Sequence, residues 1–337
     1  MKILVTGGTG FLGSYLLRYL VQQNANVRAI KRSSSSMHLV EDIKDKIEWV
    51  DGDILDIFSL EAAMQGVDCL YHCAAVVSFD SKDAAKLKQI NVEGTANVVN
   101  IALSTGVKRL LHVSSIAAIG RSKETPEVTE KVMFVRNPMN TQYAISKFQG
   151  EQEAWRGAAE GLDVVIVNPS VIIGSGFWDS GTNGFFHQIN NGLKFYPVGA
   201  TGFVDVRDVA RAMILIMNSD ISDERFILNA ENITYQTFLN WIAEDLQQPK
   251  PSIKVNTLLQ ELAWRIAWLT SKITGKKPFL TKESARSSAR TFRYQNDKFI
   301  QYFPDFEFRS MRTTVSETAA QFQKDITDNQ PFNTLPL

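Results

Sequence analysis

The chain has 337 residues, enough for one large domain or two unequal ones, and its 44% hydrophobic and 21% charged residues are typical of a globular protein. Lysine plus arginine equals aspartate plus glutamate at 36 each, which excludes the basic field of a nucleic-acid-binding protein and leaves small molecules as the expected partners. Two cysteines, Cys69 and Cys73, cannot form a disulfide framework or a zinc pattern, so we expect no metal site. There is no signal peptide and no apolar run of the roughly 18 residues that span a membrane, so the expected compartment is the cytoplasm.

Strand-like runs alternate with helical periodicity through the first half of the chain. We expect strands at 2–6, 27–30, 47–50, 68–73, 108–113 and 163–167, and helices at 11–23, 87–103 and 143–160. Strands that alternate with helices pair in parallel through right-handed crossovers. The sequence therefore predicts an α/β fold, a Rossmann-type doubly wound parallel sheet.

The pattern loosens after Pro169. Residues 174–202 are rich in glycine and aromatic residues and are interpreted as loops around a cavity, and two late strands are expected at 203–206 and 226–228. From residue 234 onward the pattern is mostly helical, through 258–273 and 311–322. We predict a dinucleotide-binding domain of residues 1–170, to which 203–230 return, and a smaller substrate-binding region of residues 171–202 and 231–330.

A glycine-rich turn lies between the first strand and the first helix. A pyrophosphate needs a tight turn, a bare backbone and a helix N-terminus aimed at it, and Gly7, Gly10 and Gly13 can supply all three. Gly8, Gly10 and Gly13 match the same G-x-G-x-x-G pattern, so the register stays open. The predicted cofactor-binding residues of this turn are Gly7, Thr9, Gly10, Phe11, Leu12 and Gly13.

The end of the second strand bears on the choice of cofactor. An NAD-binding fold usually places an acidic residue there to hold the ribose 2′-hydroxyl, but here the residues are Lys31, Arg32 and Ser33. Two cations suit a 2′-phosphate, and a guanidinium can grip it bidentately. We therefore expect NADP(H), with Arg32 as the main contact, and NAD(H) is the alternative.

Jointly, the motifs resemble the extended short-chain dehydrogenase/reductase family. They are the TGGTGFLG turn, Asp53-Ile54 after the third strand, Ala74-Ala75 after the fourth, Val113-Ser114-Ser115, Tyr143-x-x-x-Lys147, and the late segment 203–210. The C-terminal third is more loosely similar to the dihydroflavonol reductase and 3β-hydroxysteroid dehydrogenase branch. The resemblance implies that Asp53 and Ile54 lie at the adenine, that Ala74 and Ala75 lie along the cofactor, and that Pro169 and Ser170 lie near the nicotinamide. It also implies a homodimer formed through helices 87–103 and 143–160.

The predicted catalytic residues are Ser115, Tyr143 and Lys147, supported by Asn91. Tyr143 and Lys147 are four apart and share a helix face, so the ammonium is expected to lower the pKa of the phenol. The phenol can then exchange a proton with a substrate oxygen while the nicotinamide exchanges a hydride. In the family the catalytic serine precedes a glycine, here Gly120, by five residues, which selects Ser115. Ser114 is interpreted as a hydroxyl satisfied by backbone.

Two further residue types carry a structural alternative. Asn91 is a poor choice for a helix interior, and a satisfied core amide explains it as well as a supporting role at the site does. His72 and His112 fall within strands and are expected to be core histidines.

Three functions compete. The first is a ketone or aldehyde reductase, equally an alcohol dehydrogenase, acting on an apolar or ring substrate. The second is a nucleotide-sugar epimerase or dehydratase, but Thr201 stands where the epimerases carry a diphosphate-binding arginine, and Arg207 should point elsewhere. The third is a non-catalytic cofactor-sensing protein, against which the intact Ser115, Tyr143 and Lys147 speak. The aromatic residues expected to wall the substrate pocket, half of which could be core, are Phe177, Trp178, Phe185, Phe186, Phe195 and Tyr196.

The segment 258–273 carries two tryptophans, Trp264 and Trp268, one helical turn apart. With Arg265, Lys272, Lys276 and Lys277 nearby, a membrane-surface helix is one interpretation. We expect instead that both tryptophans pack onto the substrate-binding region.

Overall fold

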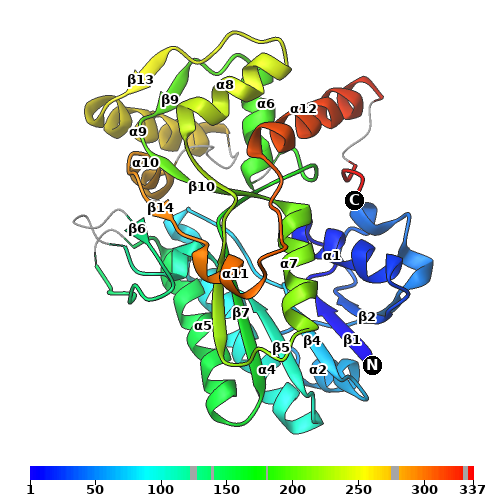
Figure 1. The fold of residues 1–337 in the computed structure, drawn as a ribbon. Helices are drawn as coiled ribbons and strands as arrows, with labels where there is room; N and C mark the ends of the chain where they lie inside the picture. The colour runs from blue at the N-terminus through cyan, green and yellow to red at the C-terminus, as the bar shows by residue number, and fades with distance from the viewer. Residues whose placement is uncertain (122–126, 138–139, 180, 275–280, 329–332) are drawn as a thin grey trace.

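The computed structural model describes residues 1–121, 127–137, 140–179, 181–274, 281–328 and 333–337 (Figure 1). Its main feature is a seven-stranded sheet, parallel throughout, in the order β11-β7-β5-β4-β1-β2-β3. The strands are β1 (Lys2–Thr6), β2 (Asn26–Lys31), β3 (Glu48–Asp51), β4 (Cys69–His72), β5 (Arg109–Val113), β7 (Asp163–Pro169) and β11 (Glu224–Leu228). The predicted doubly wound parallel sheet is confirmed. Its strand order reverses between β1 and β4, where ligands bind in such folds.

Helices cover both faces of this sheet (Figure 1). On one face lie α1 (Phe11–Gln22) and α7 (Val206–Met217), and on the other lie α2 (Ile57–Met64), α4 (Gly94–Thr105) and α5 (Gln142–Ala159). Neighbouring strand residues alternate between the two cores: Val5 and Leu111 belong to the first, and Leu4 and Leu110 to the second. Because both faces are buried, the strands are almost continuously apolar, which is why they stood out in the sequence.

The helix predicted at 87–103 is interrupted. The structure has α3 (Ala84–Lys88), a π turn (Gln89–Glu93) and then α4. The π turn contains Asn91, and the next helix layer approaches it closely, since a Cβ at Gly150 of α5 would lie 2.2 Å from the Asn91 carbonyl oxygen. A π turn inserted in an α-helix often marks a functional site.

The C-terminal half adds smaller elements above the carboxyl ends of the sheet strands (Figure 1). A three-stranded sheet contains β8 (Val171–Ile173), β10 (Ala200–Asp205) and β12 (Glu231–Thr234), and two strand pairs join β9 (Phe195–Pro197) to β13 (Ile253–Val255) and β6 (Glu127–Val128) to β14 (Arg293–Tyr294). The helices are α6 (Gly184–Asn190), α8 (Tyr235–Asp245), α9 (Thr257–Thr274), α10 (Lys282–Ser288), α11 (Asp297–Tyr302) and α12 (Met311–Thr327). Short 3-10 turns occur at His38–Val40, Lys44–Lys46, Ser81–Asp83, Ile116–Ala118 and Gly181–Asn183.

The late strand expected at 203–206 is β10, and it pairs with β8 and β12 rather than with the central sheet. The chain rejoins the central sheet through α7 and β11. The division of the chain into two domains stays a prediction.

The aromatic wall predicted for the substrate pocket is wrong in part. Trp178 and Phe186 are buried in the core of the C-terminal region, where their rings meet Phe322 edge-on or tilted. The Trp178 indole nitrogen also donates a hydrogen bond to Asp325 (2.9 Å). Phe185 and Tyr196 pack partly against the same core, and Phe195 is exposed.

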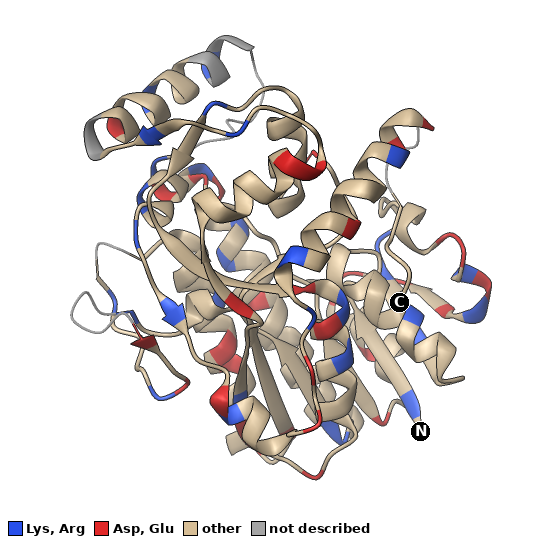
Figure 2. Cartoon of the chain, turned by 45° about the horizontal axis from the view of Figure 1, so that its top comes forward, with Lys and Arg blue, Asp and Glu red and all other residues tan. Residues whose placement is uncertain are grey.

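Helix α9 departs from expectation too. Trp268 is 43% exposed, beside exposed Leu262, Ile266 and Leu269, so the prediction that it packs onto the substrate region is wrong. Trp264 is half-buried. Among the described residues no helix is long and apolar enough to cross a membrane. Acidic and basic residues are interspersed over the molecule (Figure 2).

Candidate active site

The glycine turn is shaped for close backbone approach. Gly7 has φ +71°, and a Cβ there would lie 2.7 Å from the Ala74 nitrogen. A Cβ at Gly13 would lie 2.2 Å from the Gly7 carbonyl oxygen, while one at Gly8 would meet mainly the flexible Leu17 side chain. Of the two registers left open by the sequence, this geometry favours Gly7, Gly10 and Gly13, since Gly7 has the left-handed backbone and, unlike Gly8, faces backbone atoms.

The same turn leads into the N-terminus of helix α1, a helix end of the kind that suits a phosphate. Gly10 is the N-cap, its cap makes no side-chain hydrogen bond, and the first turn has no acidic residue. Thr9, Phe11 and Leu12 are partly exposed around it. Free helical amides and a bare backbone fit the pyrophosphate of a dinucleotide, because both present N–H groups to the anion.

The residues predicted at the adenine end are brought together at the carboxyl ends of β2 and β3. The Lys31 ammonium pairs with Asp51 (2.5 Å), whereas Arg32 is exposed and forms no ion pair within the described chain. Asp53 accepts a hydrogen bond from the Leu55 nitrogen (3.0 Å), and Ile54 is buried. Of the two predicted cations, Arg32 is the one whose charge is available to a 2′-phosphate.

The residues predicted along the nicotinamide end follow β4 and β7. The Ala74 nitrogen donates to the Thr6 hydroxyl (3.3 Å), and Ala75 is exposed. Pro169 ends β7, and the hydroxyl of the next residue, Ser170, is buried without a hydrogen-bond partner in the described part of the chain. A buried unpaired hydroxyl is costly, and the carboxamide of a nicotinamide would satisfy it. The residues at the adenine end and those at the nicotinamide end of the site therefore both fit a dinucleotide.

Ser115 and Tyr143 meet at the end of β5. The Ser115 side chain lies close enough to the Tyr143 phenol to act on its pKa, and its oxygen accepts a hydrogen bond from the Ala117 nitrogen (3.1 Å). Burial raises the pKa of Tyr143, while Ser115 and the charge of Arg121 act to lower it. The Phe79 ring packs edge-on to Tyr143, with centroids 5.7 Å apart.

Lys147 lies on the same face of α5 but is directed to the sheet. Its ammonium donates to the Val113 carbonyl (2.7 Å), and it is only 3% exposed. Burial lowers the pKa of Lys147 to about 8, and Glu151 partly opposes that shift. The predicted lowering of the Tyr143 pKa by Lys147 is wrong for this structure, because burial outweighs it and the opposing contributions come from Ser115 and Arg121.

A buried carboxylate, Glu151, supports the catalytic strand. It accepts hydrogen bonds from Ser114 (2.6 Å), Asn168 (2.8 Å) and Arg225 (2.8 Å). Asn168 also donates to the Ser115 carbonyl (3.1 Å). The partner of Ser114 is thus a carboxylate, not the backbone as predicted. Sequence reasoning missed Glu151, although it follows Tyr143 and Lys147 at the helical spacing that places it on their face.

Asn91 ties three segments together. Its side-chain Oδ1 accepts a hydrogen bond from the Val76 nitrogen (2.8 Å). Its side-chain Nδ2 donates to the Val76 carbonyl (2.9 Å) and to the Ser146 hydroxyl (3.0 Å). It therefore holds the loop after β4 against α5, next to the Tyr143/Lys147 turn. These contacts are compatible with both interpretations of Asn91. Its side-chain amide is satisfied, as in a core residue, and the segments that it joins contain the residues of the site.

The two strand histidines are buried, as predicted. His72 bridges Thr6 (2.7 Å) and Thr95 (3.0 Å), and burial lowers its pKa to about 3. His112 lies beside it, with ring centroids 5.3 Å apart, and its pKa is lowered for the same reason. The imidazoles of His72 and His112 are therefore neutral and form part of the core beneath the site. Cys69 is buried as well, and Cys73 is partly exposed.

The comparisons with known proteins agree with this geometry. The NAD dependent epimerase/dehydratase family model matches residues 3–229. The chain is similar to a putative dihydroflavonol 4-reductase of Synechocystis sp., at 33% identity over 308 residues covering 88% of each chain. It is also similar to sterol demethylase protein B of Methylococcus capsulatus, at 33% identity over 267 residues covering 77% of this chain and 79% of the other.

Among solved structures, gox2253 superposes with a TM-score of 0.80 at 27% identity, covering 96% of this chain and 98% of the other. The resemblance drawn from the motifs is confirmed. The chain belongs to the NAD-dependent epimerase/dehydratase family, the extended short-chain dehydrogenases/reductases, and is an NAD(P)-dependent enzyme of that kind.

Proposed function

We propose that the protein reduces a ketone or aldehyde with NADPH, or oxidises the corresponding alcohol, through Ser115, Tyr143 and Lys147. The observation that carries the proposal is the placement of the Ser115 hydroxyl beside the Tyr143 phenol, close enough to act on its pKa, where the chain leaves β5. Two hydroxyl groups that meet at the carboxyl end of β5 can both reach one substrate oxygen. The relative named a dihydroflavonol 4-reductase supports a reduction.

In this mechanism each side chain acts on a proton or on its position. The Ser115 hydroxyl donates a hydrogen bond to the substrate oxygen and orients it. The Tyr143 phenol, whose pKa is raised, stays protonated at neutral pH and delivers its proton to that oxygen as negative charge develops. A bound nicotinamide supplies the hydride. The Lys147 ammonium, held by the Val113 carbonyl, anchors α5 to the end of β5 and so positions the turn that carries Tyr143.

The residues that would hold the cofactor are those described above. The turn of Gly7, Gly10 and Gly13 receives the pyrophosphate, Asp53 and Ile54 flank the adenine, and Arg32 pairs with a 2′-phosphate. Ser170 receives the carboxamide through its unpartnered hydroxyl. This assignment favours NADP(H) over NAD(H), because Arg32 is the cation without an acidic partner among the described residues.

A nucleotide-sugar substrate is disfavoured by the contacts of Arg207. This guanidinium is buried, donates to Asp205 (2.6 and 3.0 Å) and to the Pro336 carbonyl (3.2 Å), and pairs with Glu317. Its hydrogen bonds are made to structural partners, so it points away from the predicted substrate position as expected, and Thr201 carries no charge. A non-catalytic sensing role is disfavoured because the Ser115–Tyr143 pair is assembled.

The test is a steady-state assay of carbonyl reduction with Tyr143→Phe. Loss of the phenol proton should lower kcat by roughly 10²- to 10⁴-fold and leave NADPH affinity nearly unchanged. Tyr302→Phe, a half-exposed tyrosine on α11, is the matched control and should keep wild-type turnover. Wild-type kcat in Tyr143→Phe would show that the assigned acid is wrong.

We also propose a homodimer through α4 and α5. These helices pack side by side, with Arg156 of α5 donating to Asn100 of α4 at their outer surface (2.8 Å). Two such pairs would form a four-helix seam. Sedimentation at micromolar concentration should show a dimer, and a monomer there would contradict the proposal.

A further inference from the structure

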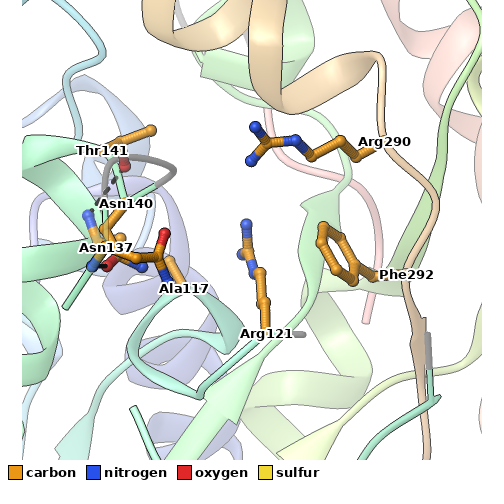
Figure 3. Close-up of a pocket in the computed structure, with 8 residues that line it drawn as sticks. Ala117, Arg121, Asn137, Asn140, Thr141, Arg290 and Phe292 are labelled. Atoms are coloured by element: carbon orange, nitrogen blue, oxygen red, sulfur yellow. Dashed lines mark hydrogen bonds between the residues drawn. The ribbon is translucent and has the colours of Figure 1, made fainter. Parts of the chain in front are cut away.

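A small pocket adjoins the Ser115/Tyr143 pair (Figure 3). Three segments that are distant in the sequence form it. The loop after β5 contributes Ala117 and Arg121, the start of α5 contributes Thr141 and Ala144, and the chain after α10 contributes Arg290 and Phe292. Figure 3 shows the Arg121 and Arg290 side chains directed toward one another across this space.

The positive charge in this pocket is not compensated. Among the described residues neither Arg121 nor Arg290 has a carboxylate within salt-bridge distance, and the buried Arg121 Nε has no hydrogen-bond partner. Burial lowers the pKa of Arg290, and the charges of Arg121 and Arg286 lower it further. Two guanidiniums that face each other without an acid are costly for the protein alone and become favourable once an anion lies between them.

Both arginines are held in place before any ligand arrives. The Arg121 guanidinium lies over two aromatic rings, with its carbon 5.3 Å from the Phe292 centroid and 6.0 Å from the Tyr294 centroid. The Arg290 carbonyl accepts a hydrogen bond from the Ala200 nitrogen (3.1 Å), and Gly199 lies so close that a Cβ there would be 2.1 Å from this oxygen. Fixing the side chain of one arginine and the backbone of the other reduces the entropy lost when a ligand binds.

Residues that line the pocket also contact or neighbour the reacting groups. The Ala117 nitrogen donates to the Ser115 hydroxyl, Thr141 and Ala144 flank Tyr143 on α5, and the charge of Arg121 acts on the Tyr143 phenol. An anionic group seated between the arginines would therefore belong to the molecule whose carbonyl reaches Ser115 and Tyr143.

We propose that the substrate carries an anionic group, a carboxylate or a phosphate, that pairs with Arg121 and Arg290 while the carbonyl lies at Ser115 and Tyr143. The part of this proposal that places the carbonyl at Ser115 and Tyr143 rests on the proposed reductase function. It narrows the substrate from an apolar or ring compound to an anionic one. The planar guanidiniums suit both anions, since each can accept two parallel N–H bonds.

Binding without turnover is the first test. Benzoate, phenyl phosphate and neutral benzamide are titrated calorimetrically into the full chain loaded with NADP⁺. Arg121→Ala and Arg290→Ala should each weaken the tighter-binding anion by roughly 10- to 100-fold and leave benzamide unchanged. The preference between benzoate and phenyl phosphate identifies the anion. Arg121→Lys, which keeps the charge, should lose less than Arg121→Ala and covers the case in which the alanine variant folds poorly.

Arg286→Ala is the matched control. Arg286 lies on α10 close enough for its charge to act on Arg290, but it is already paired with Glu261 (2.9 Å). Its removal should change the affinity for either anion by less than about twofold, as for other exposed ion pairs. Wild-type anion affinity in both Arg121→Ala and Arg290→Ala, or no preference for the anions over benzamide, would overturn the proposal.

Turnover separates this proposal from the one it rests on. The substrates 4-carboxybenzaldehyde and methyl 4-formylbenzoate share one carbonyl and differ in charge. With NADPH, Arg290→Ala should lower kcat/KM for the acid by roughly 10- to 100-fold and for the ester by less than twofold. Equal use of both by wild type and variant would overturn the anion site and leave the reductase intact. Arginine-dependent anion binding with reduction of neither aldehyde would overturn the reductase and leave the anion site intact.

Discussion

The cofactor end and the substrate end of the site are built in different ways. The cofactor end is mostly backbone: a turn of seven residues in which Gly7 and Gly13 allow neighbouring backbone segments to approach closely. The substrate end is made of side chains, with Arg121, Thr141 and Arg290 brought together from three segments. A backbone site depends on local conformation, whereas a side-chain site depends on how distant segments pack.

This difference has a functional meaning. A backbone cradle recognises the pyrophosphate that is common to every dinucleotide, so it can stay the same while substrates change. Convergent side chains can be exchanged one by one, which allows one fold to serve many substrates. Under the proposed anion site, the choice of substrate depends on Arg121 and Arg290 and not on the glycine turn.

The largest expected effect tests whether the substrate end begins at Ser115. Ser115→Ala should lower kcat by roughly 10²- to 10³-fold, because the substrate oxygen loses a positioned donor. Ser114→Ala is the neighbouring control. It should leave kcat within a few-fold but lower the melting temperature, because the buried Glu151 loses a hydrogen bond. If the two variants exchanged these effects, the assignment of the serine would be wrong.

The next effect breaks the cofactor end. Gly13→Val would place a side chain where the Gly7 carbonyl lies 2.2 Å away, and the turn would have to move. A shift of about 1 Å can cost roughly 100-fold, and we expect a loss of that size in NADPH affinity by fluorescence titration. Gly66→Asn, at a left-handed glycine with open space around it, should bind NADPH normally. Normal binding by a folded Gly13→Val would refute the cradle.

A smaller effect distinguishes the two cations beside the cofactor. Arg32→Ala should weaken NADPH by roughly 10-fold and barely change NADH, since only NADPH has the 2′-phosphate. Lys31→Ala should change NADPH by less than about threefold, because Asp51 already neutralises that ammonium. Titration of both cofactors against both variants measures this. Equal or tighter binding of NADH by wild type would remove the basis for the NADP(H) preference.

The smallest effect concerns stability at Lys147. Its pKa is lowered to about 8 by burial, so between pH 8 and 10.5 the unfolded chain binds more protons, and the free energy of unfolding rises with pH. Below pH 8 the buried charge is a constant penalty. Lys147→Met removes it, and the melting temperature at pH 7 should rise by about 2 to 4 °C for each kcal/mol gained.

The gain should shrink as the pH rises from 8 to 10.5, because the folded lysine is then neutral while the unfolded lysine still binds protons, and carbonyl reduction should be impaired at every pH. Thermal melts of wild type and Lys147→Met at pH 7 and pH 10 measure the difference. A wild type that is more stable than Lys147→Met at pH 7 would mean that the ammonium is stabilised in the folded chain, contrary to the direction of its pKa.

Several features could be predicted from the sequence because they depend on residues close together in the chain. The parallel sheet followed from apolar runs that alternate with helical periodicity, and all seven of its strands lie within a few residues of the predicted positions. The glycine turn and the shared face of Tyr143 and Lys147 also follow from local spacing. Even there, only the close approach of Ala74 to Gly7 decided which glycines form the cradle.

Other features depend on contacts between segments that are distant in the sequence, and only the tertiary structure determined them. Trp178 and Phe186 have the composition of a pocket wall but are core residues, because α12 brings Phe322 and Asp325 against them. The Ser114 hydroxyl donates to a carboxylate because helix α5 places Glu151 next to the end of β5. Arg121 and Arg290 look like ordinary surface cations in the sequence. They become a candidate anion site because β14 pairs with β6 and holds the chain after α10 against the loop after β5, a contact that no local pattern encodes.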